Sequence, residues 1–594
     1  MGRDTGKREG DILKKLLIYL REYKKESVLA PLFKMLEAMF DLLVPLVMAS
    51  IINTGITNGD RTFILTRCGL LILLGVIGLT CSITAQYFAA KAAVGFSTGL
   101  RHALFAHIQS LGFTEMDQLG TSTLITRMTS DINQVQSGLN LFLRLFLRSP
   151  FIVFGSVVMA FLVNARAAVI FVVTIPLLSV VVFGIMLWTM PLYRKVQGSL
   201  DGILGIAREN LTGVRVIRAF GREHQEKERF EQGNEQLVHG QLFVGKISSL
   251  MNPLTYVIIN LAIVAILNTG AVQIQSGTLM QGDVVALVNY MSQILVELVK
   301  LANLIIQVTK ALACADRAAS VLSVKPGMQF GVDPAKSEKT KNTPDETEEV
   351  AFDHVSFTYA GAGAEALSNV HFTVKKGQTV GIIGGTGSGK STLVNLIGRF
   401  YDATDGTIRI AGRDIRSYSR EELRRKIGVV MQKAQLFSGT IRSNLLWGDQ
   451  NATNEALWSA LRTAQAESFV REKEKGLDDP VEQGGRNLSG GQKQRLTIAR
   501  ALVSNPEILI LDDSASALDF ATDAALRRAI RELDEELTVF IVSQRTSSLR
   551  HADLILVLDD GLVVGMGSHS QLMEHCPVYR EIHESQFGKA GGQA

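Results

Sequence analysis

A glycine-rich run between residues 384 and 391 has the composition of a phosphate-binding loop. Its sequence, Gly384-Gly-Thr-Gly-Ser-Gly-Lys-Ser391, fits the pattern G-x-x-x-x-G-K-[ST]. The apolar stretch 379–383 precedes it and the stretch 392–397 follows it, which predicts a strand leading in and a helix leading out. Glycines let backbone N–H groups approach phosphate oxygens, and a helix N-terminus adds partial positive charge. A turn that fits the pattern by accident is the weaker alternative.

The residue types in this run also predict how a nucleotide and its metal are held. Lys390 is expected to reach the β- and γ-phosphates, and Ser391 to ligate Mg²⁺. The buried apolar run 508–511 ends at Asp512, which would deliver a carboxylate to the same magnesium ion. The expected phosphate-binding residues are Gly384, Gly385, Thr386, Gly387, Ser388, Gly389, Lys390, Ser391 and Thr392.

These residues belong to the second half of the chain, where short β-branched runs alternate with amphipathic helical patterns. This texture predicts an α/β domain with a largely parallel sheet over residues 348–588. The polar stretch 324–347 is expected to be a linker, and 589–594 a short tail.

The first half of the chain is much more apolar. Four stretches carry no charge, at 69–90, 149–165, 167–193 and 247–282, and each is near or above the length that spans a bilayer as a helix. Two less pure spans, 28–52 and 284–309, complete a set of six. We therefore expect an α-helical six-span transmembrane domain over 26–323, followed by the α/β P-loop domain.

The charges of the connecting segments predict how these spans are oriented in a cell membrane. The long connections 91–140 and 194–246 are rich in Lys and Arg, which predicts that they, both termini and the nucleotide domain are cytoplasmic in a multi-pass protein, as at a bacterial plasma membrane. Residues 1–25 are expected to form a cytoplasmic N-terminus and an interfacial helix. Glu297 and Lys300, inside the last span, are expected to face a substrate cavity, and an intrahelical pair is the alternative.

Composition excludes several classes. Hydrophobic residues make up 47% of the 594, which excludes a disordered chain, and a net charge of +4 excludes nucleic acid as a partner bound by charge alone. The four cysteines show no paired spacing, which excludes a disulfide scaffold and a zinc ribbon.

The run Leu488-Ser-Gly-Gly-Gln492 resembles the signature of ATP-binding-cassette proteins. The order of motifs also resembles that family, with the P-loop first, then Gln432 as the glutamine loop, the signature, the strand ending at Asp512, and 516–519 as the D-loop. Six spans followed by one cassette resemble an exporter half-transporter. The resemblance implies ATP and Mg²⁺ as ligands. It also implies that Tyr359 stacks on adenine, that Gln432 joins Ser391 and Asp512 at the metal, and that the partner's ATP is contacted by Ser489, Gly490, Gly491 and Gln492.

The family mechanism implies two cassettes that sandwich two ATP molecules, each between the P-loop of one chain and the signature of the other. Short segments at the tips of cytoplasmic loops would couple their closure to the membrane helices. The candidates in this chain are 112–117 and 208–215, and 480–487 lies in the loop before the signature.

Two catalytic positions depart from the family pattern. The family usually has Glu after the Walker B aspartate and His at the switch position, where this chain has Asp513 and Gln544. Because the binding motifs are intact, the chain resembles the degenerate-site subunit of bacterial heterodimeric multidrug exporters. That resemblance implies that the partner subunit is a second half-transporter with intact Glu and His. It also implies that the subunits contact membrane lipid and that the substrate is a small amphiphilic or drug-like molecule. A homodimeric lipid or peptide exporter, an ATP-gated regulatory subunit and an importer subunit are the alternatives.

Overall fold

The computed structural model describes residues 16–331, 348–514, 517–533 and 536–587. The chain divides into two compact units. A helical unit comprises Met1–Gln109 and Thr121–Val324, and a second unit comprises Ser110–Gly120 and Lys325–Ala594. The expected segments 1–15, 332–347 and 589–594, as well as Ser516 of the expected D-loop, lie outside the described residues.

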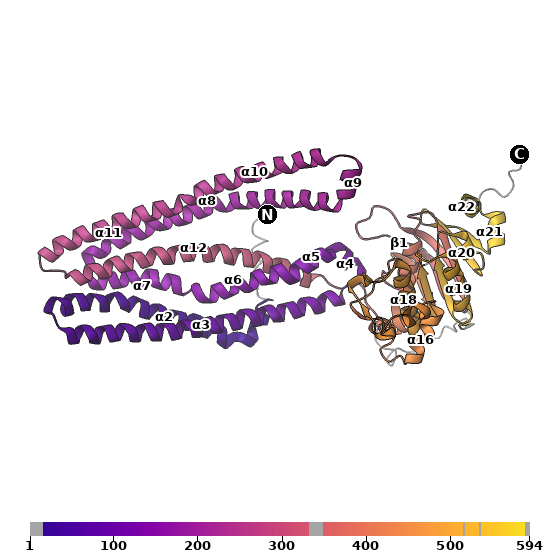
Figure 1. The fold of residues 1–594 in the computed structure, drawn as a ribbon, viewed down its shortest axis with the longest axis horizontal. Helices are drawn as coiled ribbons and strands as arrows, with labels where there is room; N and C mark the ends of the chain where they lie inside the picture. Colours follow the sequence, from indigo (N-terminus) through magenta and orange to yellow (C-terminus); the bar gives the residue numbers. More distant parts are fainter. Residues whose placement is uncertain (1–15, 332–347, 515–516, 534–535, 588–594) are drawn as a thin grey trace. The chain divides into compact units, whose positions relative to one another are not determined.

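Within its described residues, the helical unit is built from long helices that run side by side and from short helical segments that continue or connect them (Figure 1). They are η1 (Leu17–Tyr23), α2 (Lys24–Ser50), η2 (Ile51–Ile56), α3 (Arg61–Ser110), α5 (Thr121–Thr126), η3 (Arg127–Asp131), α6 (Ile132–Leu145), α7 (Arg148–Val163), α8 (Ala165–Thr212), α9 (Val214–Ala219), α10 (Glu223–Ser249), α11 (Met251–Gln275) and α12 (Gln281–Ser323).

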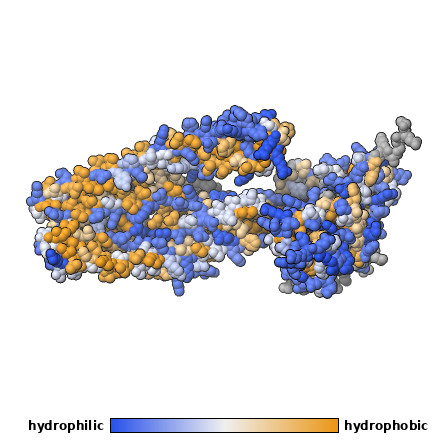
Figure 2. All heavy atoms as spheres, in the orientation of Figure 1, coloured by the Kyte–Doolittle hydropathy of each residue, from blue (hydrophilic) through white to orange (hydrophobic). Residues whose placement is uncertain are grey.

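Six of the helical stretches in the described chain are long and apolar enough to cross a membrane: Leu17–Ile56, Arg61–Ser110, Thr121–Val163, Ala165–Thr212, Glu223–Gln275 and Gln281–Ser323. This confirms the predicted six spans. Figure 2 shows hydrophobic residues gathered over much of this unit. Ile72, Phe154 and Val180 lie on three of these spans and are 69%, 71% and 71% exposed, as expected for side chains that face lipid.

Small residues and one buried tyrosine hold these helices together. A methyl group placed on Gly138 of α6 would lie 2.2 Å from the Cβ of Ala311, so α6 and α12 approach closely at a glycine. On α12, Tyr290 is fully buried and its hydroxyl donates to the Leu42 carbonyl at 2.6 Å, which satisfies its polar atom inside the unit.

The second unit contains the predicted α/β domain. Its six-stranded sheet has the order β12-β11-β3-β10-β9-β6, and all neighbours pair in parallel except β11 and β12. The strands are β3 (Thr379–Gly384), β6 (Ile427–Val430), β9 (Ile508–Asp512), β10 (Thr538–Val542), β11 (Leu554–Asp559) and β12 (Leu562–Gly567). The fold class predicted from the sequence is thereby confirmed.

A separate antiparallel sheet was not anticipated. Its order is β2-β1-β4-β5, from β1 (Glu348–Phe357), β2 (Leu367–Lys375), β4 (Asp405–Ile410) and β5 (Arg413–Asp414), and β7 (Gly439–Thr440) pairs with β8 (Pro480–Val481). The described helices of this unit are α4 (Phe113–Leu119), α13 (Lys390–Ile397), η5 (Ile415–Ser417), α14 (Arg420–Lys426), α15 (Ile441–Leu445), α16 (Asn454–Thr463), α17 (Glu467–Arg471), η6 (Gly476–Asp478), η7 (Gln483–Gly485), α18 (Gly490–Val503), α19 (Phe520–Arg531), α20 (Thr546–Leu549), α21 (His569–His575) and α22 (Pro577–Phe587).

The beginning of the expected linker packs on the cassette. The Arg399 guanidinium lies 4.5 Å from the centroid of the Phe330 ring, and the Gly331 N–H donates to the Tyr418 carbonyl at 3.1 Å. Polar, glycine- and proline-containing composition predicted a linker here, but it could not reveal these contacts, because the residues that make them lie far along the chain.

Candidate functional site

The glycine-rich loop connects β3 to α13, as the sequence predicts. Gly389 precedes α13 with a φ of +92°, a left-handed conformation that glycine adopts without steric cost. A Cβ at Gly384 would lie 2.1 Å from the Leu558 carbonyl oxygen of the neighbouring strand β11. These two positions require glycine, and the loop then places successive N–H groups at the start of a helix.

Lys390 is folded back into the loop that it follows. Its Nζ donates to the Gly384 carbonyl at 3.0 Å, to the Gly385 carbonyl, and to Ser388 Oγ at 3.4 Å. Burial lowers the pKa of the Lys390 ammonium, and the nearby Asp513 and Asp512 carboxylates oppose that change. The loop thus holds a positive charge where the motif requires one.

Ser391 and Asp512 meet although 121 positions separate them in the chain. The Ser391 hydroxyl donates to Asp512 Oδ1 at 3.2 Å, and burial raises the pKa of the Asp512 carboxyl. Two oxygen atoms side by side suit Mg²⁺, which prefers hydroxyl, carboxylate and water oxygens. The donor set of this site therefore fits the expected metal.

Asp513 lies beside this pair. It has a φ of +44°, and its N–H donates to the Val542 carbonyl at 3.1 Å. Gln432 follows β6, and its amide lies 3.5 Å from Asp513 Oδ2. Burial raises the pKa of the Asp513 carboxyl, and the Gln432 amide, Lys390 and Arg545 oppose that change. The ends of β3, β9 and β6 thus bring the predicted residues of the site together.

Gln544 follows β10, between the strands that carry the P-loop and Asp512. Its side chain is exposed, while its backbone carbonyl accepts a hydrogen bond from Gln586 Nε2 at 2.6 Å. Gln586, on α22, also accepts from the Thr546 N–H at 2.9 Å. Sequence reasoning missed Gln586, because a glutamine in a C-terminal amphipathic helix belongs to no motif.

Tyr359 is half-buried next to the P-loop helix. Its hydroxyl and Thr392 Oγ1 are 3.0 Å apart, and its ring packs edge-on against Phe357 and Tyr401, with centroids 4.8 and 5.3 Å away. Its adenine-stacking role stays a prediction.

The signature forms the start of α18. Ser489 is the N-cap, its Oγ accepts from the Gln492 N–H at 3.3 Å, and the Ser489 N–H donates to Gln492 Oε1 at 3.0 Å. This capping box leaves Ser489 and Gly490 exposed at a positive helix N-terminus. The arrangement is suited to an anion presented from outside the chain, and Gly491 follows in the first turn.

The candidate coupling segment 112–117 forms α4, which packs on the cassette. The Phe113 ring lies 4.8 Å from the Phe400 ring, and the Tyr401 hydroxyl donates to Asp117 Oδ2 at 2.7 Å. The Glu115 carboxylate accepts from the Gly112 N–H at 2.8 Å, and from the Gly327 N–H at 3.0 Å. Burial, together with the Asp117 carboxylate, raises the pKa of the Tyr401 hydroxyl. The segment Ser110–Gly120, which contains α4, thus belongs to the same compact unit as the cassette.

A role for Glu297 and Lys300 at a substrate cavity stays a prediction, and in this structure Glu297 is buried inside the helical unit. Glu297 is 3% exposed, and its carboxylate contacts Arg148 Nη1 at 2.7 Å, Ser149 Oγ at 2.8 Å and Lys300 Nζ at 2.9 Å. The intrahelical pair with Lys300 is present, but the more buried partner is Arg148, which also contacts Asp41 at 3.0 Å. A charge buried among α2, α7 and α12 needs such partners, and this explains the position of Glu297 inside the helical unit.

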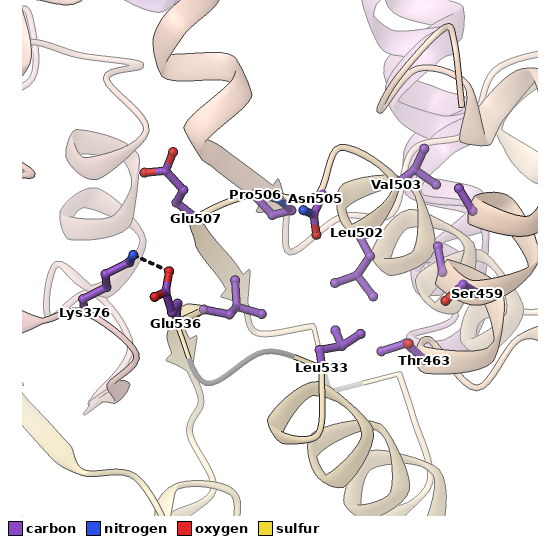
Figure 3. A pocket seen from close by; sticks show the side chains of 13 residues that line it. Lys376, Ser459, Thr463, Leu502, Val503, Asn505, Pro506, Glu507, Leu533 and Glu536 are labelled. Atoms are coloured by element: carbon purple, nitrogen blue, oxygen red, sulfur yellow. Dashed lines mark hydrogen bonds and ion pairs between the residues drawn. The ribbon is translucent and has the colours of Figure 1, made fainter. Parts of the chain in front are cut away.

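Away from the P-loop, the cassette has a pocket with a volume of about 360 Å³ (Figure 3). Lys376 and Glu536 form an ion pair of 2.5 Å on one side, and Leu502, Val503 and Leu533 lie on the other. It is at the amino-terminal ends of β9 and β10, whereas ligands of parallel α/β sheets bind at the carboxyl ends. The pocket is therefore separate from the P-loop site.

The fold and the site define an ATP-driven transporter of the membrane: a P-loop cassette with a signature helix follows six membrane-spanning helices. Residues 27–298 match the family described as ABC transporter transmembrane region, and residues 367–516 match the family described as ABC transporter. The chain belongs to the ABC transporter family, as an exporter half-transporter with one membrane region and one cassette. The predicted ATPase activity and multi-pass membrane location are confirmed at this level.

Similar proteins extend over nearly the whole chain. An uncharacterized ABC transporter ATP-binding protein of Mycobacterium tuberculosis is 37% identical over 573 residues, which cover 96% of this chain and 97% of that protein. The uncharacterized ABC transporter ATP-binding protein YfiB of Bacillus subtilis is 36% identical over 98% of this chain and 100% of its own length. The ATP-dependent lipid A-core flippase of Vibrio vulnificus is 30% identical over 97% of this chain and 98% of its own.

The fold is also similar to that of a solved bacterial Atm1-family ABC exporter with ATP bound. The TM-score is 0.77 at 23% identity, and the match covers 96% of this chain and 99% of that one. At this identity the likeness is one of fold.

Proposed function

We propose that the chain is one subunit of a heterodimeric exporter, and that its own ATP site binds ATP but hydrolyses it slowly. The observation that carries the proposal is the pair Asp513 and Gln544, at the two positions where the family pattern has Glu and His. Both residues follow strands of the parallel sheet, near a P-loop and an Asp512 whose motifs are intact in the sequence.

Binding at this site is assigned to residues of this chain. The loop N–H groups and the start of α13 would receive the β- and γ-phosphates, with Lys390 supplying a full positive charge. Bound Mg²⁺ would be held by Ser391, Asp512 and Gln432 and would neutralise phosphate charge. The ring of Tyr359 would lie against the adenine.

Slow hydrolysis follows from the chemistry of the two altered side chains. Aspartate is one methylene shorter than glutamate, so its carboxylate reaches less far toward the water that must attack, and near-attack geometry is sensitive to shifts of about 1 Å. The Gln432 amide also lies 3.5 Å from the Asp513 carboxylate. Gln544 can donate and accept hydrogen bonds, but it cannot take up a proton as histidine can.

The intact signature implies a partner. Ser489, Gly490, Gly491 and Gln492 form a capped helix start, exposed at Ser489 and Gly490, that would contact the γ-phosphate held by another chain's P-loop. If that chain carries the usual Glu and His, its site would perform most of the hydrolysis. The α4 segment, seated on Phe400 and Tyr401, would transmit cassette closure to the membrane helices.

The transported substrate is proposed to be a small amphiphilic or drug-like molecule that leaves the cytoplasm. A lipid is the second candidate, because relatives about 30% identical over almost the whole chain are named ATP-dependent lipid A-core flippases. In that case the exporter could be a homodimer, with Asp513 acting as a sufficient base.

Steady-state ATPase of the chain purified alone in lipid nanodiscs tests the proposal. We expect Mg-ATP to bind with turnover far below that of the co-expressed pair, and Lys390→Ala to serve as the background control. ATPase of the chain alone that equals the rate of the pair would favour the homodimer instead.

A further inference from the structure

A β-bulge on the first strand of the cassette gathers three side chains of the kind that bind metals. Phe352 pairs with Phe372 and Val355 pairs with Val370, so two residues of β1, Asp353 and His354, lie opposite the single residue His371 of β2. A bulge turns an additional side chain to the same face of the sheet. Asp353, His354 and His371 therefore share one face, with each offering a ligand atom within 4.8 Å of the others.

The backbone is shaped to hold this bulge. His354 has a φ of +50°, and Gly406 of the neighbouring strand β4 lies against it. A Cβ at Gly406 would lie 2.3 Å from the His354 carbonyl oxygen and 2.7 Å from that of Asp353. Phe352 and Phe372 stack beneath it, with centroids 4.6 Å apart, and both are buried. The three side chains thus stand on a rigid part of the sheet.

The separation of the ligand atoms fits a shared metal ion better than a hydrogen bond. His371 Nδ1 and Asp353 Oδ1 are 3.6 Å apart, which is long for a hydrogen bond. Two ligands at about 2.0–2.1 Å from one tetrahedral zinc ion lie roughly 3.4 Å from each other. The imidazole rings of His354 and His371 are stacked with centroids 5.0 Å apart, so the third ligand atom also lies nearby.

A neighbouring asparagine and an arginine complete the surroundings. His354 Nδ1 lies 2.7 Å from Asn369 Oδ1, and since that oxygen can only accept, Nδ1 carries the proton and Nε2 is left with its lone pair. Metal-binding histidines commonly donate their other N–H to an oxygen in this way. Arg409 Nη1 lies 3.7 Å from Asp353 Oδ2 and leaves Oδ1 directed to His371.

We propose that Asp353, His354 and His371 bind one divalent transition-metal ion of the Zn²⁺ class, with water in the remaining position. Two imidazoles and one carboxylate are ligands that Zn²⁺ favours over Mg²⁺, so this site is chemically distinct from the magnesium position at Ser391 and Asp512. The ion would join edge strand β2 to β1. The inference does not rest on the heterodimer or on the degenerate ATP site.

Zinc titration of the full-length chain in detergent, purified without a polyhistidine tag and stripped with EDTA, tests the site. Zn²⁺ is titrated against a chromogenic chelator, and Co²⁺ is used as a spectroscopic probe of four-coordinate geometry. The chain has ten histidines, so the quantity compared is the difference between variants. His575→Ala is the matched control, because His575 is also exposed on the cassette and lies 3.7 Å from the carboxylate of Glu574.

We expect the wild-type chain to bind one more equivalent of Zn²⁺ than His354→Ala or His371→Ala, and His575→Ala to match the wild type. Asn369→Ala should weaken binding about 10- to 100-fold, as expected when the partner of a ligating histidine is lost. Retained binding of an ATP analogue shows that each variant is folded. Equal zinc stoichiometry and affinity in the wild type and His371→Ala, or the absence of the four-coordinate Co²⁺ spectrum from the wild type, overturns the proposal.

Discussion

Replacing Glu297 by glutamine should destabilise the helical unit far more than the same change at Lys300. Glu297 is 3% exposed and accepts from Arg148 and Ser149, whereas the Lys300 side chain is 42% exposed. Glutamine keeps the size of the side chain but removes its charge and places an amide donor next to one of the existing donors. Among the ion pairs of the described residues, Arg148 would then keep only those with Asp41 at 3.0 Å and with Glu37 at 3.8 Å.

The expected magnitude follows from burial. Breaking a buried ion pair by removing one partner costs about 3–5 kcal/mol, and the remaining carboxylates near Arg148 place this case at the lower end, about 3 kcal/mol. Lys300→Gln removes a pair exposed on one side, which is worth about 0–1 kcal/mol. With an unfolding entropy of about 2.1 cal/mol/K per residue, a unit of about 310 residues shifts its midpoint by about 1.5 °C per kcal/mol, so Glu297→Gln should melt roughly 5 °C lower.

The cysteines of the chain supply the assay. Cys81 and Cys314 are free and buried in the helical unit, Cys576 is buried in the cassette, and Cys68 is exposed. In a background with Cys68→Ser and Cys576→Ser, a fluorogenic maleimide reacts with Cys81 and Cys314 as they become exposed on heating. Its fluorescence therefore reports the thermal unfolding of the helical unit alone. The reasoning is refuted if Glu297→Gln exposes its two thiols at the same temperature as Lys300→Gln.

Two further predictions concern the cassette. Lys390→Ala should weaken ATP binding to the full chain about 10- to 100-fold, since it removes charge-assisted hydrogen bonds of about 1.5–3 kcal/mol. The control is Lys473→Ala, which removes a lysine outside the P-loop. If Lys390→Ala binds ATP as tightly as Lys473→Ala, the P-loop assignment is wrong. Tyr401→Phe deletes the hydroxyl that donates to Asp117 at 2.7 Å, so amides of α4 should exchange hydrogen about fivefold faster, as about 1 kcal/mol of lost hydrogen bonding implies. Tyr418→Phe removes a hydrogen bond to Ile410 elsewhere in the cassette, and an equal rise in α4 exchange there would contradict the docking of α4.

Local sequence patterns predicted the parts of the fold that depend on local physics. Charge-free runs such as 167–193 specify membrane helices because no charge interrupts them over the thickness of a bilayer. The P-loop was predictable because its glycine spacing is a local pattern, and the φ of +92° at Gly389 is a local reason for glycine. The close approach of the Leu558 carbonyl to Gly384 comes from a distant strand and could not be predicted in this way. Asp512 was placed by the rule that parallel strands deliver side chains at their carboxyl ends.

Contacts between distant segments were not predictable in the same way. Arg148 was not singled out, because an arginine at the start of a membrane helix gives no sign that its partners are Glu297 and Asp41, far away in the chain. Gln586 donates a hydrogen bond to the backbone carbonyl of Gln544, but no sequence motif marks it as a residue of the site. The bulge at Asp353 and His354 depends on strand register, which one sequence leaves open.

The central claim is that the two ATP sites of the assembled exporter are unequal, and one measurement on the co-purified pair tests it. Asp513 has a left-handed backbone with a φ of +44°, a conformation that asparagine also tolerates, so Asp513→Asn removes the charge with little strain. Steady-state ATPase is compared for this variant and for the partner's catalytic Glu changed to Gln. We predict that the partner change nearly abolishes hydrolysis, since that side carries the general-base work, while Asp513→Asn retains most of the rate. A fall in ATPase with Asp513→Asn that is as deep as the fall with the partner variant would show that the sites are equivalent and would contradict the account.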